Sequence, residues 1–93
     1  MTLHFPNPSR SFDATRKRVR FWGYDESIEV SFFVEEDALR KIDPALQDAA
    51  EAGFLKAFDD ARQRIESVAD NVYRRDRKRS HTLSLAAVDF QYL

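Results

Sequence analysis

The sequence predicts an α+β protein in two layers: a mostly antiparallel sheet of three to four strands, with one long helix and one short helix on one face. Three observations support this prediction. Residues 18–34 alternate apolar and polar side chains, which is typical of paired strands. Residues 44–75 carry apolar side chains every three or four positions, as in an amphipathic helix. The chain has 93 residues with only two glycines and three prolines, enough for one ordered core, so we expect a single domain over residues 1–93.

The N-terminal part, residues 1–17, is predicted to be an extended segment with turns. The prolines and asparagine of residues 6–8 disfavour regular structure there. A short strand is expected near residues 11–14, and Leu3 and Phe5 suit another edge piece.

Residues 18–34 predict an antiparallel hairpin. If Asp25 and Glu26 form the turn, Val19 lies opposite Phe32. One face of the hairpin is then continuously apolar. Its members are Val19, Phe21, Gly23, Ile28, Val30, Phe32 and Val34.

Two helices are expected after the hairpin. The acids of residues 35–37 complement the dipole of a short helix that ends near Ile42. Asp43-Pro44 is typical of an N-cap followed by proline at the first helical position, so a long helix is expected from there to about Arg75. Gly53 is a site where this helix can bend. The predicted core residues are Phe21, Val30, Phe54 and Phe58.

The C-terminal part is expected to return to the sheet. Residues 74–81 form a basic segment between the long helix and the last strand, and the basic helix end should project past the core or fray. Alternation resumes over residues 80–85, with Leu83 and Leu85 on one face. A single turn is expected at residues 86–90.

Several of these segments together resemble a known family. They are Phe5-Pro6-Asn7, Ser9–Asp13, Val19-Arg20-Phe21 with Gly23, Ile28–Val34, Glu36–Leu39 and Asp89-Phe90. In them the chain resembles a small bacterial family, domain of unknown function 1488. The resemblance implies a compact two-layer fold with a mostly antiparallel sheet, and it implies no catalytic residue, cofactor or partner.

Composition excludes several functions. The net charge of -1 excludes a basic field over the whole molecule, and the absence of cysteine excludes disulfides and thiolate sites. No apolar run suits a signal or a membrane span, so we expect a cytoplasmic protein without membrane contact.

His81 has Ser80 and Asp89 near it in sequence, but this set alone does not define a triad. We therefore expect no enzyme and no cofactor. Binding of a divalent cation by residues 35–37 is an alternative to their role at the helix start.

The polar face of the hairpin is the candidate partner-binding surface. In the predicted register, Arg18 lies opposite Phe33 and Trp22 opposite Glu29. Aromatic and arginine side chains on a sheet can hold a partner's side chains or stack bases. The alternative is that they form ordinary cross-strand and cation–π pairs, partly covered by the N-terminal segment. The candidate residues are Arg18, Arg20, Trp22, Tyr24 and Phe33.

Charge is segregated along the chain, with net +4 over residues 1–24, -7 over 25–52 and +4 over 74–81. If the two basic runs meet, they form a strip that can contact phosphates; otherwise they are solvated faces of separate elements. The strip candidates are Arg16, Lys17, Arg74, Arg75, Arg77, Lys78 and Arg79.

The predicted function is a non-enzymatic binding or regulatory module that contacts a protein, or a second copy in a homodimer. The alternative is a weak nucleic-acid binder that uses residues 16–20 and 74–79.

Overall fold

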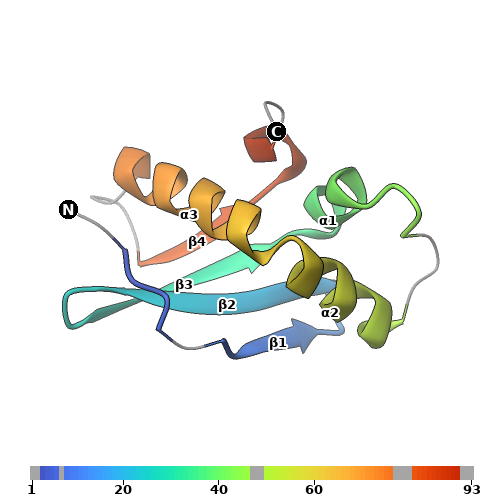
Figure 1. The fold of residues 1–93 in the computed structure, drawn as a ribbon, viewed down its shortest axis with the longest axis horizontal. Coiled ribbons are helices and arrows are strands. Elements are labelled where there is room, and N and C mark those ends of the chain that lie inside the picture. Colours follow the sequence, from blue (N-terminus) through green and yellow to red (C-terminus); the bar gives the residue numbers. More distant parts are fainter. Residues whose placement is uncertain (1–2, 7, 47–49, 77–80, 91–93) are drawn as a thin grey trace.

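The computed structural model describes residues 3–6, 8–46, 50–76 and 81–90, and it confirms the α+β fold class (Figure 1). The strands pair in the order β1-β2-β3-β4, with β1–β2 and β2–β3 antiparallel and β3–β4 parallel. The elements are β1 (Arg10–Asp13), β2 (Arg18–Asp25), β3 (Ile28–Val34), α1 (Glu36–Ile42), α2 (Glu51–Asp60), α3 (Arg62–Asp76), β4 (Thr82–Leu85) and the 3₁₀ turn η1 (Ala87–Phe90).

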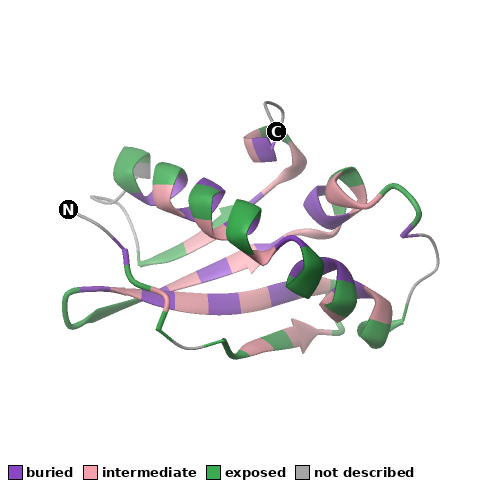
Figure 2. Ribbon diagram, viewed as in Figure 1, coloured by how far each residue is buried: buried purple, intermediate pink, exposed green. Residues whose placement is uncertain are grey.

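The helices lie on one side of the sheet and bury its apolar face (Figure 1). Buried and half-buried residues alternate along β2, as Figure 2 shows. The ring of Phe21 lies 5.3 Å from that of Phe32 and 5.2 Å from that of Phe58, between centroids. The predicted core residues Phe21, Val30, Phe54 and Phe58 are all buried, which confirms their placement.

The hairpin register differs from the predicted one by two residues. Asp25 lies opposite Ile28, so the turn consists of Glu26 and Ser27. Glu26 has a φ of 57°, the positive value that a tight hairpin turn needs at its first central residue. A shift by two keeps every side chain on its predicted face, but it moves Ile28 to the end of the ladder. Ile28 stays on the predicted side of the sheet, but it is 48% exposed and does not join the core.

The N-terminal residues extend the outer edge of the sheet beside β2. The backbone N–H groups of His4 and Tyr24 each donate to the other residue's carbonyl, at 2.9 and 2.8 Å. The Phe5 ring turns to the core side, 5.8 Å from Phe21 between centroids. A Cβ on Gly23 would lie 2.7 Å from Phe5 Cε1 and 2.8 Å from the His4 carbonyl oxygen. Glycine at position 23 therefore allows this segment to pack closely on the sheet.

The short helix α1 is present as predicted, but the predicted start of the next helix is wrong. The Asp43 N–H donates to the Leu39 carbonyl at 2.9 Å, so Asp43 closes α1. Its carboxylate accepts the Ala45 N–H at 3.1 Å, forming a local turn instead of an N-cap. The next helix, α2, begins at Glu51.

The predicted long helix is divided into α2 and α3 at Ala61. The backbone of Ala61 leaves helical geometry, with φ -110° and ψ 15°. Its N–H still donates to Ala57 and Phe58, and its carbonyl accepts the Ile65 N–H at 3.0 Å. A straight helix of thirty residues would be about 45 Å long, whereas the longest dimension of the protein is 37 Å. The helical stretch therefore breaks at Ala61 and not at Gly53, which lies within α2.

The end of α3 is joined to the hairpin turn by a buried hydrogen bond. The Tyr73 hydroxyl donates to Asp25 Oδ2 at 2.6 Å, and both residues are buried. Strand β4 and the turn η1 follow, as predicted. The expected projection of the basic helix end falls mainly on residues 77–80, which lie outside the described residues. No helix in the described part of the chain is long and apolar enough to cross a membrane.

Candidate functional site

The polar face of the sheet, here called the outer sheet face, lies opposite the helices. Because cross-strand partners share a face, the strand registers define its members. They are Ser11, Asp13, Arg18, Arg20, Trp22, Tyr24, Glu29, Ser31, Phe33, Thr82 and Ser84. Trp22, Tyr24 and Phe33 are partly exposed. Among the described residues, the N-terminal segment pairs with the edge of β2 and thus lengthens the sheet, and no helix covers this face.

Arg18 is held at one end of the outer sheet face. Its guanidinium carbon lies 3.8 Å from the centre of the Phe33 ring. It pairs with Asp13 at 3.0 Å and with Glu35, directly after β3, at 3.3 Å. The hydrogen bond from Arg18 holds the pKa of the Asp13 carboxyl below its usual value, and the N–H groups of the β1–β2 turn act in the same direction. Charge and stacking together fix the arginine over the ring.

Arg20 occupies the middle of the face. Its guanidinium carbon lies 4.6 Å from the centre of the Trp22 ring. Its Nη2 donates to Ser31 Oγ at 2.9 Å and reaches Glu29 Oε2 at 3.3 Å. Arg20 therefore bridges the aromatic ring of β2 and the polar side chains of β3.

Two predicted cross-strand pairs on this face are wrong, because the register is shifted. Phe33 lies opposite Arg20 rather than Arg18, and Trp22 lies opposite Ser31. The contact of Arg18 with Phe33 is nevertheless made, since arginine reaches the diagonal neighbour.

The partners of the arginines were not predicted as site residues. Asp13, Ser31 and Glu35 complete the network. Ser31 lay on the predicted polar face, and its alternation with Phe33 was the available signal. Asp13 and Glu35 flank the hairpin, and only the β1 pairing and the actual register bring them to Arg18.

The described parts of the two basic runs lie at opposite ends of β2. Arg16 and Lys17 directly precede β2, whereas Arg74 and Arg75 follow Tyr73, which contacts Asp25 at the strand's other end. Eight residues of strand span about 23 Å. Within the described residues the runs therefore do not form one strip. The other candidates, Arg77, Lys78 and Arg79, lie outside the described residues.

The acids of residues 35–37 are engaged separately. Glu35 belongs to the Arg18 network, and the next two acids point to other groups. The partners of the three, in order, are Arg18, Arg40 and the backbone N–H of Ala87. In the part of the chain that the structure describes, no three His, Asp or Glu side chains are grouped so that they could hold a metal ion.

Asp89 has a structural role at the C-terminal turn. Its carboxylate accepts the Ala86 N–H at 2.8 Å and lies 3.4 Å from Arg75 Nη2. His81 is exposed before β4, and its carbonyl accepts the Ser31 N–H at 2.8 Å. The Asp89 carboxylate and the His81 carbonyl thus stabilise the C-terminal part of the fold.

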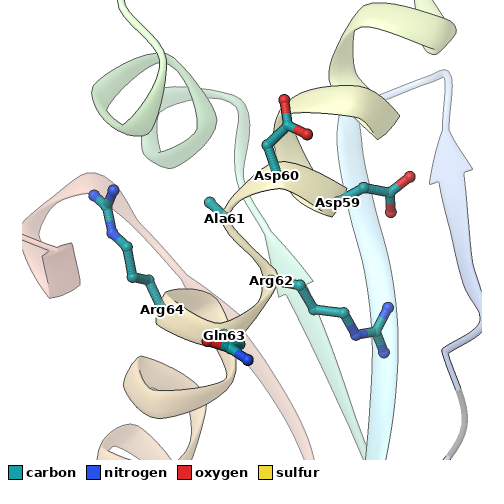
Figure 3. Close-up of a pocket in the computed structure, with 6 residues that line it drawn as sticks. All are labelled: Asp59, Asp60, Ala61, Arg62, Gln63 and Arg64. Carbon is teal, nitrogen blue, oxygen red and sulfur yellow. The ribbon is translucent and has the colours of Figure 1, made fainter.

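A hollow of about 350 Å³ lies at the break between α2 and α3 (Figure 3). It is lined by Asp59, Asp60, Ala61, Arg62, Gln63 and Arg64. The charged side chains do not converge on one centre: Asp59 and Arg62 extend to one side and Arg64 to the other. Asp59 accepts two hydrogen bonds from Arg10 at 2.9 Å, and Arg62 pairs with Glu66 at 2.9 Å. The hollow therefore lacks convergent groups for chemistry.

Residues 3–85 match the family described as "Protein of unknown function (DUF1488)". The chain belongs to this family. The match covers the whole outer sheet face of this DUF1488 chain, and it ends before the Asp89-Phe90 pair that the resemblance also included. Searches of the curated proteins and of the solved structures found no match. The family description names no function, so the function is inferred from the geometry of the outer sheet face.

Proposed function

We propose that this chain is a small non-enzymatic binding module that makes protein contacts through the outer sheet face. The observation that carries the proposal is the set of three partly exposed aromatic residues, Trp22, Tyr24 and Phe33, beside two arginines on a face without a described helix over it. Aromatic residues and arginine are enriched in protein interfaces. A contiguous patch of this kind exceeds what isolated surface side chains explain.

The charge of the face favours a protein partner over a nucleic acid. Arg18 and Arg20 are paired with Asp13 and Glu29 on the face and with the adjoining Glu35, so three carboxylates offset two arginines. Phosphate groups require unpaired cations, and these carboxylates would repel them. A partner surface with both charge signs and apolar area fits better.

Three carboxylates outside the face support a non-enzymatic role. Asp59, Glu36 and Asp89 are each engaged with an arginine, at 2.9, 2.6 and 3.4 Å. Catalysis would instead need groups that converge on one reacting atom. The chain also has no cysteine, which fits a compartment where disulfides do not contribute, and we propose the cytoplasm.

Site-specific photo-crosslinking in the native cells tests the proposal. The photoreactive amino acid p-benzoylphenylalanine replaces Trp22 or Ser84 on the outer sheet face, and Lys56 of α2 serves as the exposed control on the helical side. We expect protein adducts, with this chain or with another, from the two face positions and not from Lys56. Equal adduct yields at all three positions, or none at the face, would refute the proposal.

Nucleic-acid binding is tested separately with a mixed-sequence oligonucleotide. We expect no retardation at low salt, where phosphate contacts are strongest. Tight binding that weakens steeply with added salt would favour the alternative function.

A further inference from the structure

We propose that the occupant of the outer sheet face is a second copy of this chain, packed face to face. The inference rests on the proposed function, since it requires that face to be a contact surface. It is carried by the register of β2 and β3, which pairs Trp22 with Ser31 and Tyr24 with Glu29 on this face. Face-to-face sheets pack about 10 Å apart with their strands nearly aligned.

In this dimer a two-fold axis runs parallel to the strands, midway between the two outer sheet faces and level with the gap between β2 and β3. Rotation about the axis places β2 of one copy against β3 of the other. Residues at the same height along the strands then face each other. Each outer side chain of β2 then meets the partner copy's version of its own cross-strand neighbour. The pairs formed between the copies are those already seen within one chain.

The central pair is complementary in size. Trp22 lies opposite Ser31 in the middle of the ladder, which runs from Val19 to Asp25 on β2. Across the axis, the large ring of each copy would lie on the small serine of the other. Arg20, which donates to Ser31 at 2.9 Å, would present its guanidinium to the incoming ring. Because packed sheets are twisted relative to each other, the two copies align best at the middle of the ladder, where this pair lies.

The outer pairs are complementary in charge and polarity. Tyr24 lies opposite Glu29, so a hydroxyl would meet a carboxylate. Arg18 already lies 3.3 Å from Glu35, and across the axis each guanidinium would meet the other copy's Glu35. This arrangement brings no two like charges of these pairs together, which is the condition for a self-complementary two-fold interface.

The size of the face predicts the strength of the association. Strands of up to eight residues in a four-stranded sheet give a face of roughly 20 by 23 Å. This is small for a stable dimer. The dimer should therefore be weak and form reversibly as the concentration rises.

Sedimentation velocity of the full chain, from about 1 μM to about 1 mM, tests the proposal. The variants are W22S and S31W, and Val88→Ser, on the exposed turn η1, is the matched control. We expect the parent and Val88→Ser to dimerise. W22S and S31W alone should each raise the dissociation constant at least about tenfold, because each loses the large-to-small fit.

The decisive sample is the equimolar mixture of W22S and S31W. In a mixed dimer, one chain supplies two serines and the other two tryptophans, so both central contacts are restored. We expect the mixture to associate as the parent does. A parent that stays monomeric throughout the range, or a mixture that associates no better than its components, would overturn the proposal.

Circular dichroism checks that each variant is folded. If S31W is not folded, Arg18→Glu and Glu35→Arg form a second pair in which each variant alone is repulsive and the mixture is attractive. Failure of the dimer proposal can be distinguished from failure of the proposed function. Crosslinks from position 22 to another protein, together with a monomeric parent, would overturn the second copy and retain the binding face.

Discussion

The Tyr73 hydroxyl donates a 2.6 Å hydrogen bond to the buried carboxylate of Asp25, which lies 48 residues earlier in the chain. The bond joins the last turns of α3 to the tip of the hairpin. Tyr73→Phe removes the donor and leaves a buried acceptor, so we expect a loss of about 1–3 kcal/mol in the free energy of unfolding. Urea unfolding measures it, with Tyr24→Phe on the outer sheet face as the control. Equal stability of Tyr73→Phe and the parent would contradict the role of this bond.

Phe54 anchors α2 to the sheet. Its ring is 1% exposed and stacks on Phe12 with 5.4 Å between centroids. Phe54→Ala should cost about 3–5 kcal/mol in unfolding free energy, because it leaves a cavity in the core. Ile28→Ala, at a position 48% exposed, should cost much less. Thermal melting of both variants checks this, and a Phe54→Ala melting temperature within a degree or two of the parent would refute the placement.

The two glycines should respond in opposite directions to alanine. Gly23→Ala inserts a methyl group 2.7 Å from Phe5 Cε1 and 2.8 Å from the His4 carbonyl, and we expect a loss of about 1–3 kcal/mol. Gly53→Ala lies within α2 and should stabilise the protein by about 0.5–1 kcal/mol. Hydrogen exchange at the Tyr24 amide locates the first effect, since displacement of the N-terminal segment frees that N–H. A Gly23→Ala variant with unchanged exchange there would contradict the packing.

We predict that acid lowers the free energy of unfolding in part by protonating Asp13. The hydrogen bond from Arg18 keeps the pKa of Asp13 lower in the folded chain than its ordinary value of 3.8. The stabilisation is therefore complete above that ordinary value and declines as the pH falls through the lower folded pKa. Urea unfolding at successive pH values from neutral to strongly acidic should show a smaller acid loss in Asp13→Asn than in the parent. Identical pH profiles for the two proteins would show that the Asp13–Arg18 contact contributes nothing.

The elements that were predicted correctly are those that a periodic pattern of apolar residues is enough to identify. Alternation identified the hairpin, and both faces of β2 were correct because a shift by two preserves side-chain direction. The register itself was wrong, because the positive φ of Glu26 permits a turn that the residue types do not signal. The bend at Ala61 was also missed, since an alanine within an apolar stripe carries no breaking signal.

The residues of the outer sheet face were predicted, and its cation–π pairs were the alternative that the sequence left open, but its ion pairs were not predicted. Arg18, Trp22 and Phe33 lie on the outer sheet face as expected. Glu29, the partner of Arg20, comes from β3 and lay on the predicted polar face. Asp13 and Glu35, the partners of Arg18, come from β1 and from the residue before α1, and local pattern does not place them there. The charge of the face, which distinguishes a protein partner from a nucleic acid, thus depends on long-range pairing.

The most direct test uses Trp22, the only tryptophan in the chain, as a reporter of the outer sheet face. Acrylamide quenching of its fluorescence is measured on the parent protein from dilute to concentrated samples. We predict efficient quenching in dilute protein, where the ring is partly exposed, and progressive protection as the second copy covers it. A quenching constant that stays the same across the whole concentration range would contradict face-to-face association.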